Sequence, residues 1–141
     1  MRRLLAASLL VLAFPALTAA ATQAGKVRVV AWASTTTKAG LPTADAVSGG
    51  VYCKAKPIAK LFAFVRFAGM RDKVPSTATW LFENKKVFVF KFRWEDGDIG
   101  RTAFKLFRTK GTLAAGDYVI QVRSGGVVVG NGAVRLKFGG C

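Results

Sequence analysis

The sequence predicts an all-β protein, a sandwich of two sheets built from seven strands. Two observations carry this prediction. Short segments rich in Val, Ile, Phe, Tyr and Trp recur about every ten residues, and Gly-rich or Pro-containing turns separate them. Nowhere does an apolar stripe with the 3.6-residue period of a helix persist. Strands at this spacing are typical of a sandwich or a barrel.

The first strand is expected over residues 26–33, where valines alternate with basic residues. Residues 34–57 are expected to form a long loop, because Thr, Gly and Pro are frequent there. Residues 60–68 form an apolar run with one arginine, which predicts a strand buried on both faces or nearly so. The other strands are expected over residues 77–83, 86–94, 101–108, 117–123 and 127–138. Asn84-Lys85 and residues 124–126 are expected to be hairpin turns.

The domain organisation is predicted as a signal peptide, residues 1–24, followed by a single domain, residues 25–141. Arg2 and Arg3 precede an apolar run that ends at Leu17, and small residues follow it, which is the secretory pattern. Cleavage after Ala20 and cleavage after Ala24 both fit. The run is shorter than the roughly 20 residues that span a bilayer, so an uncleaved anchor is the less favoured reading, and no other apolar segment is long enough. We therefore expect a secreted or periplasmic protein without a transmembrane segment in the mature chain.

The chain has two cysteines, Cys53 and Cys141. An exported protein meets an oxidising compartment, so an even number of cysteines favours a disulfide. In a seven-strand Greek key, Cys53 would precede the second strand and Cys141 would follow the seventh, which places both at the same end of the sandwich. We expect an intramolecular bridge; free thiols or an intermolecular bond at Cys141 are the alternatives.

Residues 113–122, LAAGDYVIQV, resemble the L-x-x-G-x-Y-x-V-x-V segment that leads into the sixth strand of immunoglobulin-like and fibronectin type III-like domains. The resemblance extends over roughly residues 26–138. It implies that the hydroxyl of Tyr118 bonds back to the backbone of the corner before its strand. It also implies that Trp80 fills the central aromatic position of the core. The chain departs from the antibody pattern, since no cysteine pair falls on the second and sixth strands.

Composition and motifs exclude several kinds of catalytic site. The chain has no histidine, which excludes Ser-His and Cys-His nucleophiles and histidine-ligated zinc. It has no phosphate-binding G-x-x-x-x-G-K-[ST] loop. Carboxylates gather only at Glu95, Asp96 and Asp98, where a polar turn with local ion pairs is the favoured reading and calcium binding stays open. We expect no enzyme activity and no cofactor.

Charge is the most informative remaining feature. Of 22 basic residues, Arg2 and Arg3 leave with the signal peptide, while all 7 acidic residues follow it, so the mature chain of about 117 residues carries a net charge near +13. Such a field attracts polyanions. In a fibronectin-like strand order the third, fourth, sixth and seventh strands share one sheet. Its outer face would carry Gln121 and five bases: Lys91, Arg93, Arg123, Arg135 and Lys137. Glu83 is the only acid expected on that face, and the side chains expected to point inward are Phe88, Phe90, Tyr118, Ile120, Val134 and Leu136.

These observations favour a binding module that engages an anionic partner, such as envelope lipid, acidic polysaccharide or acidic protein, through the basic face. A solvated face without a ligand is the simpler alternative. Nucleic acid is least favoured, because most aromatic residues alternate inward and are not free to stack on bases. The second and fifth strands are apolar on both faces, so either residues 34–57 or another protein covers them. A structural or assembly subunit that docks by this second sheet is therefore the main alternative function, and a cationic antimicrobial or toxin-like protein is another.

Overall fold

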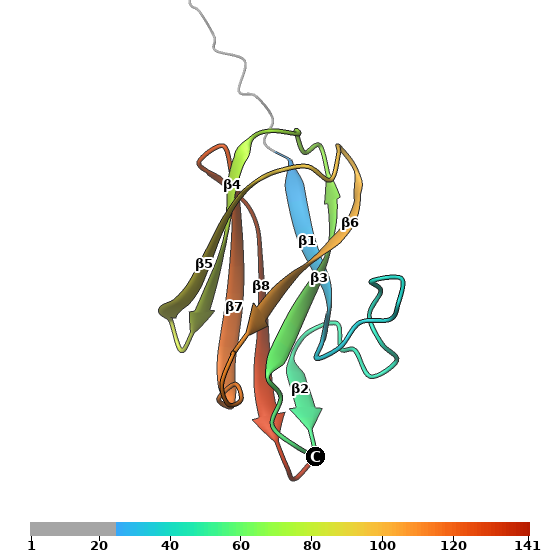
Figure 1. Cartoon of the computed structure of the whole chain (residues 1–141), viewed down its shortest axis with the longest axis vertical. Helices are drawn as coiled ribbons and strands as arrows, with labels where there is room; N and C mark the ends of the chain where they lie inside the picture. The colour runs from blue at the N-terminus through green and yellow to red at the C-terminus, as the bar shows by residue number, and fades with distance from the viewer. Residues whose placement is uncertain (1–24) are drawn as a thin grey trace, which may run out of the picture.

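The computed structural model describes residues 25–141, which form eight strands and no helix (Figure 1). The predicted signal peptide lies outside the described residues. Three predicted strands have the expected bounds, and the other four begin and end within two residues of them. The strands are β1 (Lys26–Ala33), β2 (Val51–Lys54), β3 (Lys60–Ala68), β4 (Pro75–Phe82), β5 (Lys85–Arg93), β6 (Gly100–Phe107), β7 (Gly116–Ser124) and β8 (Val127–Phe138).

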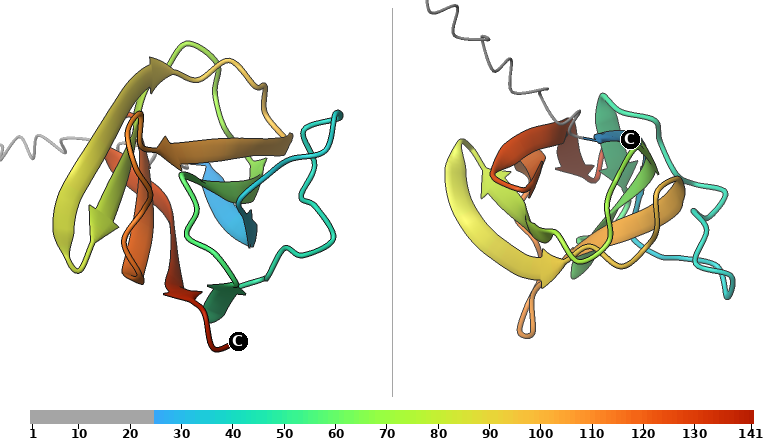
Figure 2. Two further views of the ribbon diagram at one scale, coloured as in Figure 1. Left: turned by 60° about the horizontal axis from the view of Figure 1, so that its bottom comes forward. Right: turned by 90° about the horizontal axis from the view of Figure 1, so that it is seen from above.

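Two sheets face each other, as Figure 2 shows from two further directions. One has three strands in the order β1-β3-β6, and the other has five in the order β2-β8-β7-β4-β5. All neighbours are antiparallel except β2 and β8. The prediction that β4, β5, β7 and β8 share one sheet is confirmed.

The prediction of seven strands is wrong by one, because β2 lies inside the segment expected to be a loop. It has only four residues and follows Gly49 and Gly50, so its own sequence carries little strand signal. Its backbone pairs in parallel with the end of β8, where Cys53 lies opposite Lys137. This partner is distant in sequence, so local patterns cannot reveal the strand.

Cys53 and Cys141 form a disulfide, as predicted, with their Cα atoms 5.8 Å apart. The bridge links β2 to the short segment that follows β8. Both residues lie at the end of the molecule where the chain terminates (Figure 1). The disulfide therefore fastens the edge strand β2 to its parallel partner.

The core lies between the sheets and is centred on aromatic residues. Trp32 of β1 meets Trp80 of β4 edge to face, with ring centroids 6.0 Å apart. Trp80 is 1% exposed and Tyr118 3% exposed, so both are core residues as predicted. Trp94, just past β5, is also fully buried and packs edge-on against Phe67 at 4.7 Å. Edge-to-face pairs of this kind suit the charge distribution of aromatic rings.

Two phenylalanines of β5 lie on the inner side of their sheet, as predicted, but are not buried in the core. Phe88 and Phe90 lie opposite Trp80 and Ala78 of β4, which places them on the inner side of the sheet as predicted. They are nevertheless 38% and 49% exposed. The reason is that β5 is the edge strand of the larger sheet, beyond the part that the three-stranded sheet covers. Alternation along a strand gives the side of a residue but not its burial.

The hairpin turn between β4 and β5 is displaced by one residue from its predicted position. It consists of Glu83 and Asn84, with φ angles of 49° and 65°. Left-handed geometry at both central residues is what a tight two-residue hairpin needs. In the next β-hairpin the same geometry falls on Gly125 and Gly126. Short turns at both places fix the register of the larger sheet.

Candidate anion-binding surfaces

The five bases of the predicted face do not form one cluster. Lys91 and Arg123 lie on either side of Thr77 in the sheet, and Arg93 is next to them at the end of β5. Arg135 and Lys137 instead lie where β8 pairs with β2. Asp117 of β7 lies opposite Arg135. The distance along β7 from Arg123 to Asp117, and so between the two groups, is roughly 20 Å. The sheet therefore separates three of the predicted bases from the other two.

Arg135 already has an acidic partner on this face. Its guanidinium donates two hydrogen bonds to the carboxylate of Asp117, at 2.7 and 3.0 Å. The hydrogen bond from Arg135 lowers the pKa of Asp117 below its usual value. Asp117 was not expected on this face, where Glu83 was the only predicted acid. Alternation with the inward-pointing Tyr118 already assigns Asp117 to the outer face, but only the observed register shows that it lies directly opposite Arg135.

The remaining arginines of the predicted face also have partners within the protein. Arg93 donates a hydrogen bond of 2.8 Å to the carbonyl oxygen of Lys73. Arg123 donates one of 3.3 Å to the side-chain oxygen of Gln121. These contacts hold the side chains along the sheet, although each guanidinium keeps other donors free.

A second basic surface, which alternation along the strands does not reveal, lies on the outer side of the three-stranded sheet. Arg28 of β1 lies directly opposite Arg66 of β3, and Arg66 lies directly opposite Arg101 of β6. We call these three residues the arginine row. All three are exposed, and their strand neighbours Val27, Val65 and Phe67 point into the core. Side chains directly opposite each other have Cβ atoms about 5 Å apart.

The arginine row has no acidic counterpart in its own sheet. β1, β3 and β6 contain no Asp or Glu. The two ion pairs found within residues 25–141 are Lys54–Asp45 and Arg135–Asp117, so none of the three guanidinium groups belongs to an ion pair there. In the same residues none of the three guanidinium groups makes a side-chain hydrogen bond. Like charges opposite each other destabilise a sheet. The three fork-shaped donors are thus free for bidentate bonds to carboxylate, sulfate or phosphate.

The shape of the surface also suits a ligand. An open depression of about 510 Å³ lies along the row, and its lining includes Lys26 and the strongly exposed Ile99 as well as the three arginines. A second hollow of about 350 Å³ lies between Arg66, Arg101 and residues 39–42 of the long loop. The stems of Lys and Arg can lie along apolar surface of this kind while their charged ends stay in water.

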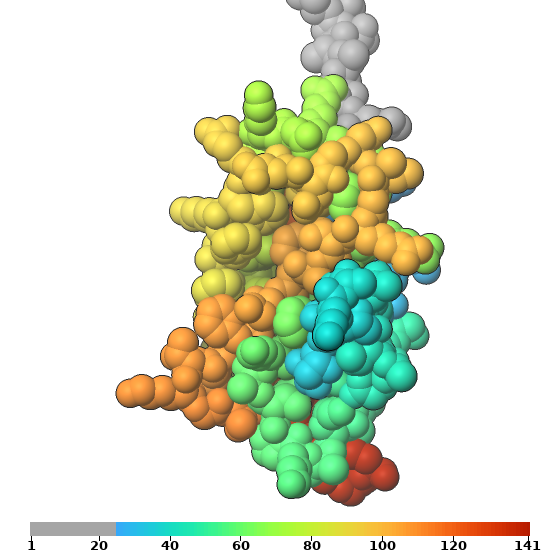
Figure 3. Space-filling view, turned by 45° about the vertical axis from the view of Figure 1, so that its right-hand side comes forward, coloured from blue at the N-terminus to red at the C-terminus, as the bar shows by residue number. Residues whose placement is uncertain are grey.

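The long loop covers part of the outer side of β3, which was one of the two predicted alternatives. Phe64 faces outward and is only 4% exposed, because Ala39, Gly40, Leu41 and Pro42 lie beside it. Figure 3 shows the loop, in cyan, folded against this side of the molecule. Farther along the same face, Phe107 stays 45% exposed. The apolar second sheet is therefore covered by the chain itself near Phe64 and uncovered at Phe107.

Asp45 connects the long loop to the sandwich through hydrogen bonds. Its carboxylate accepts hydrogen bonds from the ammonium of Lys54, the hydroxyl of Thr43 and the hydroxyl of Tyr52. The bond from Lys54 and then that from Thr43 lower the pKa of Asp45 from 3.8 to about 2. Tyr52 is itself a fully buried core residue, so the network connects the loop to the sandwich.

The acidic turn at residues 95–98 is held in place by hydrogen bonds with Trp94 and Asp72. The indole nitrogen of Trp94 donates to the carbonyl oxygen of Gly97 at 2.7 Å, and the amide of Gly97 donates to the carboxylate of Asp72 at 2.9 Å. Among residues 25–141 no group of three or more His, Cys, Asp or Glu side chains is placed to hold a metal ion. The contacts on the turn are those of a structural connection between β5 and β6.

Comparison with known proteins does not assign the chain to a family. No protein-family model matches the chain, and the search of curated proteins finds no match. Among solved structures, the chain is similar to the Pseudomonas fluorescens alkylpurine DNA glycosylase AlkC bound to DNA containing an abasic site analog, with a TM-score of 0.43 and 11% identity. The match covers 80% of this chain and 30% of the glycosylase. No helix that could cross a membrane occurs in the described part of the chain.

Proposed function

We propose that this protein is an exported, non-enzymatic binding module whose anionic partner lies along the arginine row. The observation that carries the proposal is the alignment of Arg28, Arg66 and Arg101 on neighbouring strands with no acid beside them. Neighbouring strands are about 4.8 Å apart, so the row presents three cations at a regular interval. A polymer with repeated anionic groups, such as an acidic or sulfated polysaccharide, matches that arrangement.

Other bases on the same face extend the attraction. Lys26, Lys60 and Lys105 are exposed on the outer side of the three-stranded sheet. Because the three strands contribute only basic charges to this face, its field would steer a polyanion toward the row before contact. The face first expected from the sequence is the less favoured site, since Arg135 is neutralised there by Asp117.

Export is supported by two features. The N-terminal segment has the order of charges, apolar residues and small residues of a secretory signal. The pairing of Cys53 with Cys141 suits a compartment in which disulfides persist.

Immunoglobulin-like or fibronectin type III-like ancestry of the sandwich belongs to the same proposal. It is supported by the strand orders β1-β3-β6 and β8-β7-β4-β5 and by the bond from Tyr118 to the backbone of Ala114.

The experiment compares two variants that lose equal charge from opposite faces. One carries Arg28→Gln, Arg66→Gln and Arg101→Gln; the control carries Lys91→Gln, Arg93→Gln and Arg123→Gln. Mature wild-type protein and both variants are eluted with salt from immobilised heparin, a sulfated polysaccharide. Circular dichroism confirms that each variant is folded.

We expect the row variant to elute at clearly lower salt than the control, and the control to elute close to the wild type. This follows because a diffuse field depends on total charge, whereas a local site depends on which charges are removed. Equal shifts for the two variants would overturn the proposed site. A larger shift for the control would transfer the site to the face that the sequence predicted.

A further inference from the structure

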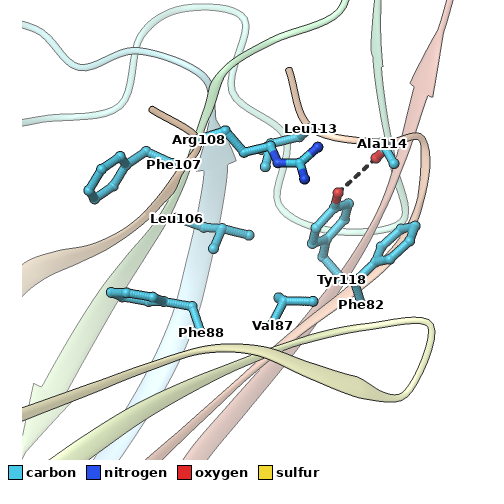
Figure 4. Close-up of a pocket in the computed structure, with 9 residues that line it drawn as sticks. All are labelled: Phe82, Val87, Phe88, Leu106, Phe107, Arg108, Leu113, Ala114 and Tyr118. Carbon is cyan, nitrogen blue, oxygen red and sulfur yellow. Dashed lines mark hydrogen bonds between the residues drawn. The ribbon is translucent and has the colours of Figure 1, made fainter. Parts of the chain in front are cut away.

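A cleft opens between the edges of the two sheets, away from the arginine row. Its volume is about 390 Å³, near the lower end of the range for small-molecule sites. Val87 and Phe88 of β5 line one side, Leu106 and Phe107 of β6 line the other, and Tyr118 of β7 contributes to the floor (Figure 4). The cleft exists because β5 and β6, although consecutive, belong to different sheets and do not pair with each other.

The walls of the cleft are apolar. Leu106, Leu113 and Tyr118 are buried beneath it, whereas Val87, Phe88 and Phe107 are exposed at its rim. The rings of Phe88 and Phe107 approach across the opening, with centroids 6.4 Å apart. Exposed aliphatic and aromatic side chains gathered around one hollow are typical of a site that accepts an apolar ligand.

Among the residues that line the cleft, Arg108 is the one cation. Figure 4 shows the guanidinium of Arg108 turned toward Leu113 and the hydroxyl of Tyr118. Its only hydrogen bond within the described residues is a long one, 3.4 Å, to the carbonyl oxygen of Thr112, and it belongs to neither ion pair found there. The Tyr118 hydroxyl already donates to Ala114, and no acidic residue lines the cleft. Arg108 is therefore the group with donors available to a ligand.

We propose that this cleft binds a free single-chain carboxylic acid, with the alkyl chain between β5 and β6 and the carboxylate on Arg108. An apolar trough whose lining includes one unpaired guanidinium is complementary to an alkyl chain that carries one negative charge. A volume of about 390 Å³ suits one alkyl chain better than the two chains of a phospholipid. A guanidinium binds a carboxylate through two parallel hydrogen bonds, which fixes the orientation of the ligand.

The test uses decanoate as the probe, with decanol and decyltrimethylammonium as ligands of equal chain length but no charge or the opposite charge. Binding to the mature protein is measured by calorimetry below the micelle concentrations of the charged ligands. Three variants are compared with the wild type: Arg108→Gln removes the cation, Val87→Glu places a negative charge at the rim, and Arg123→Gln removes an equal charge far from the cleft. Val87 and Arg108 are exposed, so neither change disturbs the core.

We expect decanoate to bind one to one and at least tenfold more tightly than decanol, and decyltrimethylammonium to bind weakest. Arg108→Gln should weaken decanoate binding about tenfold and leave decanol unchanged, because one charged pair is lost. Val87→Glu should weaken decanoate binding as well, and Arg123→Gln should leave decanoate binding unchanged. The proposal is overturned if decanoate fails to bind the wild type, if both arginine variants weaken it equally, or if charge on the ligand makes no difference. None of these outcomes bears on the arginine row, whose residues are intact in every protein used.

Discussion

The hydroxyl of Tyr118 donates a hydrogen bond of 2.8 Å to the carbonyl oxygen of Ala114, four residues earlier in the chain. Tyr118 is a buried residue of β7, and Ala114 lies in the loop that leads to that strand. The bond therefore ties the loop between β6 and β7 to the core. Burial of the ring raises the pKa of Tyr118 above its usual value.

Replacing Tyr118 with Phe removes this bond and keeps the ring. A hydrogen bond of this kind contributes about 1 kcal/mol to stability. We expect the free energy of unfolding to fall by about that amount, measured by urea denaturation with an unchanged m-value. Phe82, whose ring packs at 4.8 Å from that of Tyr118, should keep its environment. A variant as stable as the wild type would show that the hydroxyl bond contributes nothing.

Loss of the disulfide should be the largest single destabilisation. Cys53 and Cys141 are 88 residues apart in sequence, so the bridge restricts most of the unfolded chain. Chain-entropy arguments give a stabilisation of roughly 4 to 5 kcal/mol for a loop of this size. The variant with Cys53→Ser and Cys141→Ser should lose that much in denaturant titration, and reductant should affect the wild type alone. Equal sensitivity of both proteins to reductant would contradict this prediction.

Gly130 is required where β8 passes close to β1. A Cβ atom at this position would collide with the carbonyl oxygen of Val27, which is backbone and cannot swing away. Overpacking of this kind costs about 1–3 kcal/mol, so Gly130→Ala should lower the unfolding free energy by that amount. Gly49→Ala is the matched control, because a Cβ there meets nothing within 4 Å. Similar stability losses for the two variants would refute a steric cause.

Asp45 should make the loop sensitive to acid. Its pKa is about 2 in the folded protein and 3.8 when unperturbed, so its contribution to stability is complete above about pH 4 and is lost as the pH falls toward 2. We expect Asp45→Asn to be less stable than the wild type at pH 6, with the difference shrinking between pH 4 and pH 2. Asp45 is partly exposed, and solvent screening keeps the effect modest. The control Asp96→Asn, in an exposed turn, should run parallel to the wild type; a constant offset for Asp45→Asn at all pH values would exclude the ionic cause.

The fold was largely predictable because its strands are long and its turns carry clear signals. Residues 60–68 are apolar on both faces, and the structure buries the inner face in the core and much of the outer face beneath the loop. What could not be predicted depends on partners distant in sequence. β2 is a strand only because β8 lies beside it, and Phe88 is exposed only because no sheet lies over the edge.

The candidate site was predicted less well for the same reason. The sequence shows that Arg28, Arg66 and Arg101 each lie in a strand, but only the register places them opposite one another. Similarly, the pairing of Arg135 with Asp117 follows from the register of β7 and β8. Alternation assigns a residue to a face of a sheet. It does not reveal which neighbours across the sheet neutralise or reinforce its charge.

The most direct test of the arginine row is the salt dependence of polyanion binding. The affinity of a fluorescent heparin oligosaccharide is measured across a range of salt concentrations for the wild type and for the variant with Arg28→Gln, Arg66→Gln and Arg101→Gln. Each contact between a cation and the polyanion contributes close to one unit to the slope of log affinity against log salt. We expect the slope to become shallower by about the number of contacts removed. An unchanged slope for this variant would contradict the account, because the partner would then not contact the arginine row.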